Sequence, residues 1–150
     1  MNRARDVQSI AAELREAVTG TVARLSAIGE AQAGERPAEA KWAPKEVIGH
    51  LIDSASNNHQ RFVRALLEEA LVFPAYEQEG WNRIQRYRAE SWPELIALWA
   101  AYNRHLAHLI EGVPGEKLER HCTVGTNAPV TLAFLIEDYL RHLRHHLAQI

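Results

Sequence analysis

The sequence predicts an all-α protein, a four-helix bundle with a long crossover between its second and third helices. Apolar residues recur every three or four positions in four separate segments, whereas the two-residue alternation of strands is nearly absent. Clusters of glycine and proline separate the segments. Four amphipathic helices of about 20 to 27 residues are typical of a helix bundle.

The first predicted helix runs from about Arg3 to Ile28. It ends where the stretch GEAQAGERPAEA brings glycine, proline and small polar residues together. The second opens at WAPKE, because Pro44 suits a first helical turn in which its missing N–H would have had no partner. We expect this second helix to continue to about Leu71.

The third predicted helix has the clearest start signal. In SWPE, Ser91 can cap the helix while Glu94 reaches back to the N–H of the cap. The helix ends at EGVPG, where Gly112 is the residue expected just past a helix and the following proline blocks continuation. The fourth helix starts after NAPVT, with Thr131 as its cap, and runs to the end of the chain.

Two connections are longer than tight turns. Residues Phe73 to Glu90 are too many for a minimal turn and too apolar for disorder, so we expect a packed crossover with a short helix around Trp81 to Tyr87. Residues Glu116 to Val130 are consistent with an extended loop. Because 150 residues is the size of one domain, residues 1–150 are interpreted as a single four-helix-bundle domain.

The composition excludes several classes of function. The formal net charge is −2, and without a basic excess we expect no nucleic-acid partner. Cys122 is the only cysteine, which excludes an internal disulfide and a cysteine-rich zinc motif. The N-terminus has no unbroken apolar core for a secretory signal, and no run approaches the roughly 20 apolar residues of a membrane helix. We therefore expect a soluble, cytoplasmic protein with no membrane contact.

Three of the eight histidines lie in the final twelve residues, YLRHLRHHLAQI. On a helical wheel, His146 falls inside the apolar stripe of the last helix and His142 falls at its edge, whereas His145 falls on the polar side. The spacing of four residues places His142 and His146 one above the other on one face. This arrangement is one that helix-borne metal sites use, but the spacing alone is a weak signal, and two histidines packed at the edge of the core are the alternative.

A third ligand must come from another helix, because a firmly held ion needs at least three protein groups. His50 lies at the border of the buried face of the second helix, and Asn57 and Arg61 follow on the same row as a polar lining. His59 points away from this row. His105 in the third helix fits the wheel nearly as well as His50, so periodicity leaves both as candidates.

Two stretches resemble the DinB-like superfamily of small bacterial four-helix proteins, namely WAPKEVIGHLIDSASNNHQRF and DYLRHLRHHLAQI. The resemblance covers essentially the whole chain in order and spacing. It implies a divalent metal ion, zinc or nickel, held by one histidine of the second helix and two of the last. The matching positions are His50, His142 and His146, and His105 has no counterpart.

The resemblance also sets the expected chemistry. Members of the superfamily include thiol transferases that use a low-molecular-weight thiol and hydrolase-like proteins, so a metal-dependent enzyme with a small-molecule substrate is the first hypothesis. A metal-stabilised dimeric structural or interaction module without turnover is the alternative. Asp53, one turn from His50, could orient that ligand, but its polar side of the wheel favours a solvated carboxylate. We expect the aromatic residues of the crossover to fill the ends of the bundle rather than to form a substrate cage.

Overall fold

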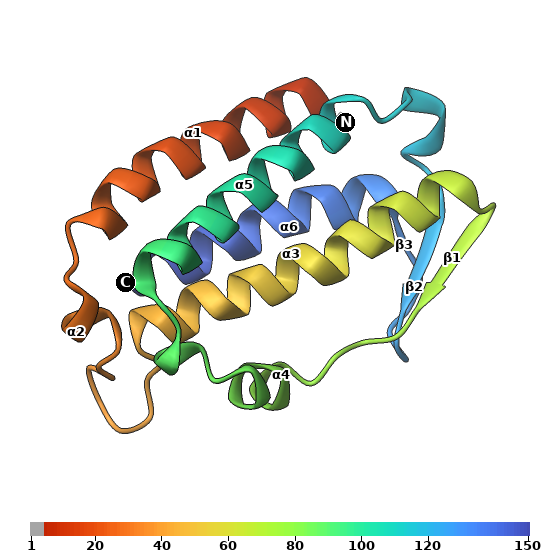
Figure 1. Ribbon diagram of the computed structural model, residues 1–150. Helices are drawn as coiled ribbons and strands as arrows, with labels where there is room; N and C mark the ends of the chain where they lie inside the picture. The colour runs from red at the N-terminus through yellow and green to blue at the C-terminus, as the bar shows by residue number, and fades with distance from the viewer. Residues whose placement is uncertain (1–4) are drawn as a thin grey trace.

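Four long helices form the body of the protein in the computed structural model, which describes residues 5–150 (Figure 1). They are α1 (Val7–Ser26), α3 (Pro44–Leu67), α5 (Trp92–Glu111) and α6 (Leu132–Leu147). Both α1 and α3 contact α5 and α6, so α1 and α3 lie on one diagonal of the bundle. The predicted bundle is therefore confirmed, and α3 has two neighbours that carry histidines.

The direction of the helices explains the long crossover. Helices α3 and α5 run the same way along the bundle, so the chain between them must return over its full length (Figure 1). The return contains the strand β1 (Ala70–Phe73), the short helix α4 (Gln78–Gln85) and the 3-10 turn η1 (Tyr87–Ala89). Both α4 and η1 pack against α3. The predicted crossover is confirmed, and its short helix lies at Gln78–Gln85 rather than around Trp81 to Tyr87.

A small three-stranded sheet covers one end of the bundle, which the all-α prediction missed (Figure 1). Strand β1 pairs in parallel with β2 (His121–Val124), and β2 pairs antiparallel with β3 (Val130–Thr131). The expected loop from Glu116 to Val130 therefore holds the strand β2 and begins with the 3-10 turn η2 (Gly115–Lys117). Strands of two to four residues are too short to show a period of two in the sequence.

The helix boundaries agree with their sequence signals at most ends. The Oγ of Ser91 accepts a hydrogen bond from the N–H of Glu94, and Thr131 caps α6 in the same way through Phe134. Helix α3 starts at Pro44 but stops at Leu67, four residues before the expected end, because the chain turns into β1. The expected start of the first helix at Arg3 lies outside the described residues, and the helix begins at Val7 after its cap Asp6.

The hydrophobic core runs through the centre of the four helices and continues under the sheet. Its largest fully buried side chains come from every long helix and from β1; they include Ile10, Leu14, Phe62, Leu71, Trp99, Leu106 and Leu132. Trp92 and Tyr87 are also buried, whereas Trp81 of the crossover is 39% exposed, so only part of the aromatic set fills the bundle. No helix within residues 5–150 is both long and apolar enough to span a membrane.

The connection between α1 and α3 is a folded loop that includes the one-turn helix α2 (Glu30–Ala33). The carboxylate of Glu30 accepts hydrogen bonds from the ammonium group of Lys45 and from the backbone N–H of Trp92, so it joins the starts of α3 and α5. The rest of the loop brings Trp42 to the first turn of α3. Trp42 becomes important at the candidate site.

Candidate metal centre

His50 of α3 meets His142 and His146 of α6 on facing sides of two adjacent helices. Each of the three side chains offers one nitrogen, and these nitrogens lie within 4.8 Å of one another. The ring centroids are 4.4 Å apart for the α6 pair, and 4.5 and 5.1 Å from the ring of His50. The structure thus brings together all three histidines predicted as metal ligands.

The separation of two of these nitrogens fits a shared ion closely. The Nε2 atoms of His50 and His142 are 3.3 Å apart. Two imidazole nitrogens bound at about 2.0 to 2.1 Å to one tetrahedral zinc ion lie about 3.3 to 3.4 Å from each other. This spacing, which is also within hydrogen-bond distance for two imidazoles, is compatible with a shared ion.

The surroundings of the cluster keep its imidazoles neutral. Burial, with the two neighbouring histidines, lowers the pKa of His50 from 6.5 to about 3. Burial and His146 lower the pKa of His142 to about 4, and burial lowers the pKa of His146 as well. Neutral imidazoles keep a lone pair on one nitrogen, which is the form that binds a metal ion. The three donors thus fit a divalent cation.

The outer ring nitrogens are held differently in two of the three histidines. Nδ1 of His146 lies 3.0 Å from Oε1 of Gln149, which can accept the ring N–H and leave Nε2 free for an ion. Nδ1 of His50 is buried and has no hydrogen-bond partner among residues 5–150. The ring of His50 instead packs against the indole of Trp42, with centroids 5.1 Å apart. Packing, rather than an acceptor, orients this ring.

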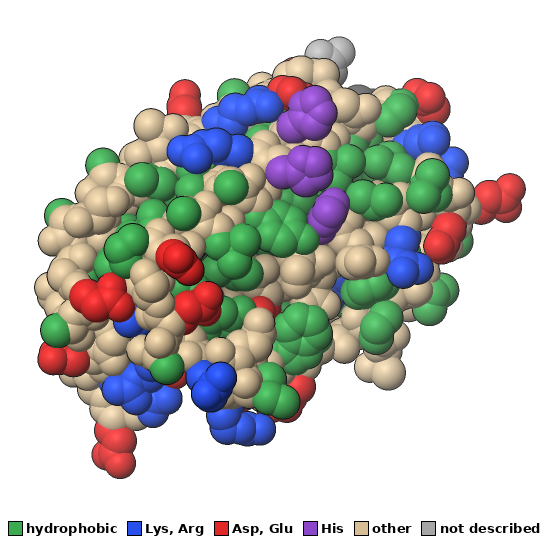
Figure 2. Space-filling view, in the orientation of Figure 1, with side chains coloured by type: hydrophobic (Ala, Val, Ile, Leu, Met, Phe, Trp, Pro, Cys, Tyr) green, Lys and Arg blue, Asp and Glu red, His purple; other side chains and the backbone are tan. Residues whose placement is uncertain are grey.

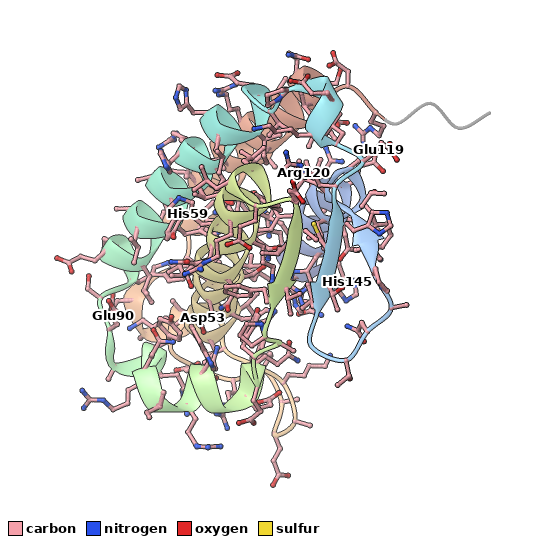
Figure 3. The ribbon with its side chains drawn as sticks, turned by 90° about the vertical axis from the view of Figure 1, so that its right-hand side faces the viewer. Asp53, His59, Glu90, Glu119, Arg120 and His145 are labelled. Atoms are coloured by element: carbon pink, nitrogen blue, oxygen red, sulfur yellow. The ribbon has the colours of Figure 1, made fainter. Side chains whose placement is uncertain are left out.

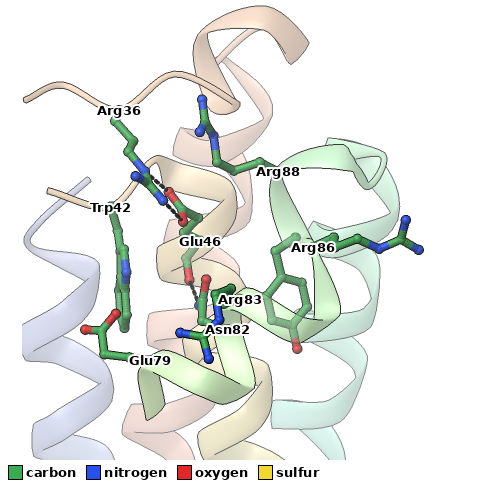
Figure 4. Close-up of a pocket in the computed structure, with 9 residues that line it drawn as sticks. Arg36, Trp42, Glu46, Glu79, Asn82, Arg83, Arg86 and Arg88 are labelled. Carbon is green, nitrogen blue, oxygen red and sulfur yellow. Dashed lines mark hydrogen bonds and ion pairs between the residues drawn. The ribbon is translucent and has the colours of Figure 1, made fainter. Parts of the chain in front are cut away.

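An ion pair holds Trp42 over the cluster. The guanidinium of Arg36 donates to both carboxylate oxygens of Glu46 at 2.9 Å, and one of these oxygens also accepts the N–H of Ala43 (Figure 4). Burial opposes ionisation of Glu46, but its bonds from Arg36 and Ala43 outweigh burial and lower its pKa. The segment containing Trp42 is therefore tied to the first turn of α3 by an ionised carboxylate.

A pocket of about 540 Å³ opens beside the cluster at His146. Trp42 and Val47 contribute apolar walls, while Lys41, Glu79 and Gln149 contribute polar groups. This volume lies within the range of small-molecule sites, about 300 to 1,000 Å³. A second pocket of about 260 Å³ adjoins it and shares Trp42 and Glu79 with it (Figure 4).

The other histidines considered in the sequence lie apart from the cluster. His145 is exposed, with its ring 5.2 Å from that of His146, and it does not belong to the group of three (Figure 3). His59 lies on the α5 side of α3 and contacts the ring of His105 at 5.4 Å. His105 is exposed and lies beside His59 of α3, away from α6. The choice of His50 rather than His105 as the third candidate ligand therefore agrees with the fold.

Asp53 is not solvated, so that expectation was wrong. It is only 2% exposed, and its Oδ1 accepts hydrogen bonds from the hydroxyl of Tyr87 at 2.6 Å and from Gln85 at 2.8 Å. Burial raises the pKa of Asp53 more than these two bonds lower it. The wheel placed Asp53 on a polar face correctly, but α4 and η1 cover that face. Asp53 thus joins the crossover to α3 and makes no bond to His50.

The predicted polar row beyond His50 has a different use. Asn57 donates its amide to the backbone oxygen of Asp53, and the guanidinium of Arg61 lies 5.7 Å from the ring centre of Phe73. Both side chains pack under the crossover. Trp42 and Gln149 were missed at the sequence level, because a residue in a loop and one past the last helical turn carry no periodic signal.

The sequence matches the DinB superfamily over residues 13–150. The chain belongs to the DinB superfamily. Two similar proteins come from Bacillus cereus and Oceanobacillus iheyensis, and each carries the name "Putative metal-dependent hydrolase". Each is 28% identical, over 73% and 75% of this chain and over 62% and 64% of the relative. The chain thus spans less than two thirds of the length of these curated relatives.

Two solved structures share the fold of this DinB-superfamily chain. YfiT from Bacillus subtilis, described as "a probable metal-dependent hydrolase with an unusual four-helix bundle topology", has a TM-score of 0.81 at 22% identity. The similarity covers 95% of this chain and 83% of YfiT. The mycothiol-dependent maleylpyruvate isomerase has a TM-score of 0.75 at 15% identity, over 99% of this chain and 62% of that protein. At these identities the likeness concerns the fold.

Proposed function

We propose that this protein binds a divalent metal ion through His50, His142 and His146 and uses it to hydrolyse a small molecule. The observation that carries the proposal is the 3.3 Å separation of the Nε2 atoms of His50 and His142, within a group whose nitrogens all lie within 4.8 Å. The names of the relatives from Bacillus cereus and Oceanobacillus iheyensis support a hydrolytic reaction.

The donor set supports zinc or nickel. Imidazole nitrogen suits both ions, whereas magnesium and calcium prefer oxygen ligands. Three neutral imidazoles leave the double positive charge of an ion uncompensated and at least one coordination position free. An ion bound there would act as a Lewis acid and lower the pKa of a water molecule toward neutrality.

The protein's own contribution is to bind and orient the substrate beside the ion. Trp42 closes one side of the cluster and offers a flat apolar surface to the 540 Å³ pocket. Gln149 holds the ring of His146 through Nδ1 and also lines that pocket. Lys41 and Glu79 stand at the pocket wall, where they can bind an anionic and a cationic or hydroxyl group, respectively.

Thiol transfer is the second candidate reaction. A solved structure with the same fold is a mycothiol-dependent isomerase, and a divalent ion with neutral ligands can bind a thiolate. The 540 Å³ pocket is large enough for a low-molecular-weight thiol. A third alternative is that the metal ion has a structural role in a homodimer that catalyses no reaction. The homodimer itself stays a prediction.

One set of measurements tests the proposal. Metal content of untagged protein is measured for the wild type, for His146→Ala and for His145→Ala, together with turnover of a panel of small esters, amides and thiols. His146→Ala should lose the ion and turnover while circular dichroism shows an intact fold, and His145→Ala should keep all three. Wild-type protein that binds neither zinc nor nickel would contradict the metal site. An unfolded His146→Ala variant would favour the structural role.

A further inference from the structure

A second group of histidines lies outside the candidate metal centre, on the outer face of two helices. His59 comes from α3 and is half-buried, while His105 and His108 come from α5 and are exposed. Figure 2 shows histidine side chains gathered on one face, over α5 and α3. The proposed hydrolytic function uses none of them.

The ring centroids of two of these histidines are about as far apart as those of two ligands of one ion. The ring centroids of His59 and His105 are 5.4 Å apart, and the two planes are perpendicular at 86°. Imidazoles bound to one tetrahedral ion at about 2.0 to 2.1 Å have ring centres about 5 Å apart. In the candidate metal centre the corresponding distances are 4.4 to 5.1 Å. The centroid spacing of the pair from α3 and α5 is therefore compatible with a shared ion.

His108 can complete the group with a change of rotamer. Its ring centroid is 6.4 Å from that of His105, one helical turn away on α5. The side chain of His108 is 76% exposed, so few packing contacts oppose its rotation. Residues three apart on a helix lie on one face with Cβ atoms about 5 to 6 Å apart. His105 and His108 can thus reach the same point above the helix surface.

A hydrogen-bond partner at the outer nitrogen of His59 favours this use. Nδ1 of His59 lies 2.9 Å from the hydroxyl oxygen of Tyr102. A histidine that binds a metal ion usually donates its other ring N–H to an oxygen, which fixes the tautomer. In the tautomer whose Nδ1–H is directed at this oxygen, Nε2 of His59 keeps its lone pair.

We propose that His59, His105 and His108 form a second, surface site for a first-row transition-metal ion. A bound ion there joins α3 to α5, two neighbouring helices. Imidazole and water ligands bind Cu²⁺ most tightly among these ions, followed by Ni²⁺ and Zn²⁺. The site is weaker than the buried one, because one ligand must rotate and all three stand near solvent. It does not depend on the proposed hydrolytic activity.

Calorimetric titration of Ni²⁺ into metal-free, untagged protein tests the site. The wild type should bind two equivalents of Ni²⁺, a tighter one at the candidate metal centre and a weaker one at the surface site. His105→Ala should lose the weaker one alone, and His146→Ala should lose the tighter one alone. His121→Ala, which removes an exposed histidine of β2, is the matched control and should keep both. The proposal is overturned if the weaker equivalent is missing in the wild type or persists in His105→Ala.

A second variant tests the geometry rather than the presence of the histidines. Tyr102→Phe removes the oxygen at Nδ1 of His59 but leaves all three imidazoles in place. Loss of such an outer partner weakens metal binding by about tenfold or more, so the weaker Kd should rise by that factor while the tighter Kd stays constant. An unchanged weaker Kd would mean that His59 does not bind through Nε2 and would contradict the arrangement. Electron paramagnetic resonance of the Cu²⁺ form should report more than one imidazole nitrogen at the surface ion.

Discussion

The ring of Tyr87 packs closely against Gly49, the residue that precedes His50 on α3. A Cβ atom added at position 49 would overlap the ring carbons of Tyr87. The hydroxyl of the same tyrosine donates to Asp53, one turn further along the helix. The crossover is therefore fixed to α3 on both sides of the position that presents His50 to α6. A glycine is required here for close packing, not for its backbone conformation.

Gly49→Ala should destabilise the protein. Alanine favours a helix by about 1 kcal/mol over glycine, but forcing a methyl group into a filled site costs about 1 to 3 kcal/mol. Denaturant unfolding should therefore show a net loss of stability together with weaker metal binding. Gly20→Ala is the control, because a Cβ at that position of α1 meets nothing within 4 Å. That variant should gain stability, and a gain in Gly49→Ala as well would contradict the packing argument.

Tyr87→Phe should destabilise the fold most strongly at neutral pH. The variant removes a donor to the buried carboxyl of Asp53, which costs about 1 to 3 kcal/mol. Burial raises the pKa of Asp53, so ionising this carboxyl in the folded state costs free energy. The cost is fully present at pH values above the folded pKa and is absent below pH 3.8, the ordinary pKa of the group. Loss of the donor increases that cost. Unfolding curves should show a wild-type advantage that shrinks as the solution is acidified.

The metal-free protein should lose stability as the pH falls below 6.5. The pKa of His50 is lowered to about 3 in the folded state, so the unfolded chain binds a proton first. The resulting loss in the free energy of unfolding develops between pH 6.5 and about pH 3. Urea unfolding with a chelator present measures it. His50→Gln should flatten the profile, whereas His121→Gln, outside the cluster, should leave it unchanged; an equally steep profile in His50→Gln would refute this origin.

Ni²⁺ should quench the fluorescence of Trp42. The indole lies 5.1 Å from the ring of His50 and 6.5 Å from that of His146, so an ion held by these histidines is close to it. The quenching that accompanies the tighter equivalent should disappear in Trp42→Phe. Trp81→Phe, which removes an exposed indole of the crossover, should retain it. Undiminished quenching in Trp42→Phe would place the ion elsewhere.

The sequence was sufficient for the four long helices and for the placement of two candidate ligands on one of them. The positions of His142 and His146 follow from the wheel of α6 alone, because both lie on or beside its apolar stripe. The third ligand did not follow in the same way. Whether His50 or His105 faces α6 depends on which helices are neighbours, and periodicity describes one helix at a time. The contacts of α3 with both α5 and α6 decide this point.

The sheet and Asp53 show two other limits of a single sequence. Strands as short as Ala70–Phe73 have one buried residue each, Leu71 in β1 and Cys122 in β2, so no alternation is visible. Asp53 lies on a polar helix face that the crossover covers with its own hydrogen-bond donors, Tyr87 and Gln85. A polar helix face predicts exposure to solvent only where no other segment of the chain packs on it and supplies its hydrogen bonds.

Glu46→Gln should loosen the segment that carries Trp42. The ionised carboxylate accepts two bonds from Arg36 and one from the N–H of Ala43, and the amide can replace only part of this set. Loss of hydrogen bonds to a charged group costs about 1.5 to 3 kcal/mol in the free energy of unfolding. The pKa of Glu46 in the folded state lies below the ordinary value of 4.5. The stabilisation of the fold by this carboxylate is therefore fully present above pH 4.5 and is lost as the pH falls through the folded pKa.

The difference between wild type and Glu46→Gln should therefore be largest at neutral pH and should decrease in acid. Denaturant unfolding over this pH range measures it, with Glu79→Gln as a control that changes another carboxylate of the same pocket. Nickel quenching of Trp42 should weaken in Glu46→Gln because the indole is no longer held over His50. A variant that is less stable but quenches normally would show that Glu46 supports the fold and that other contacts position Trp42.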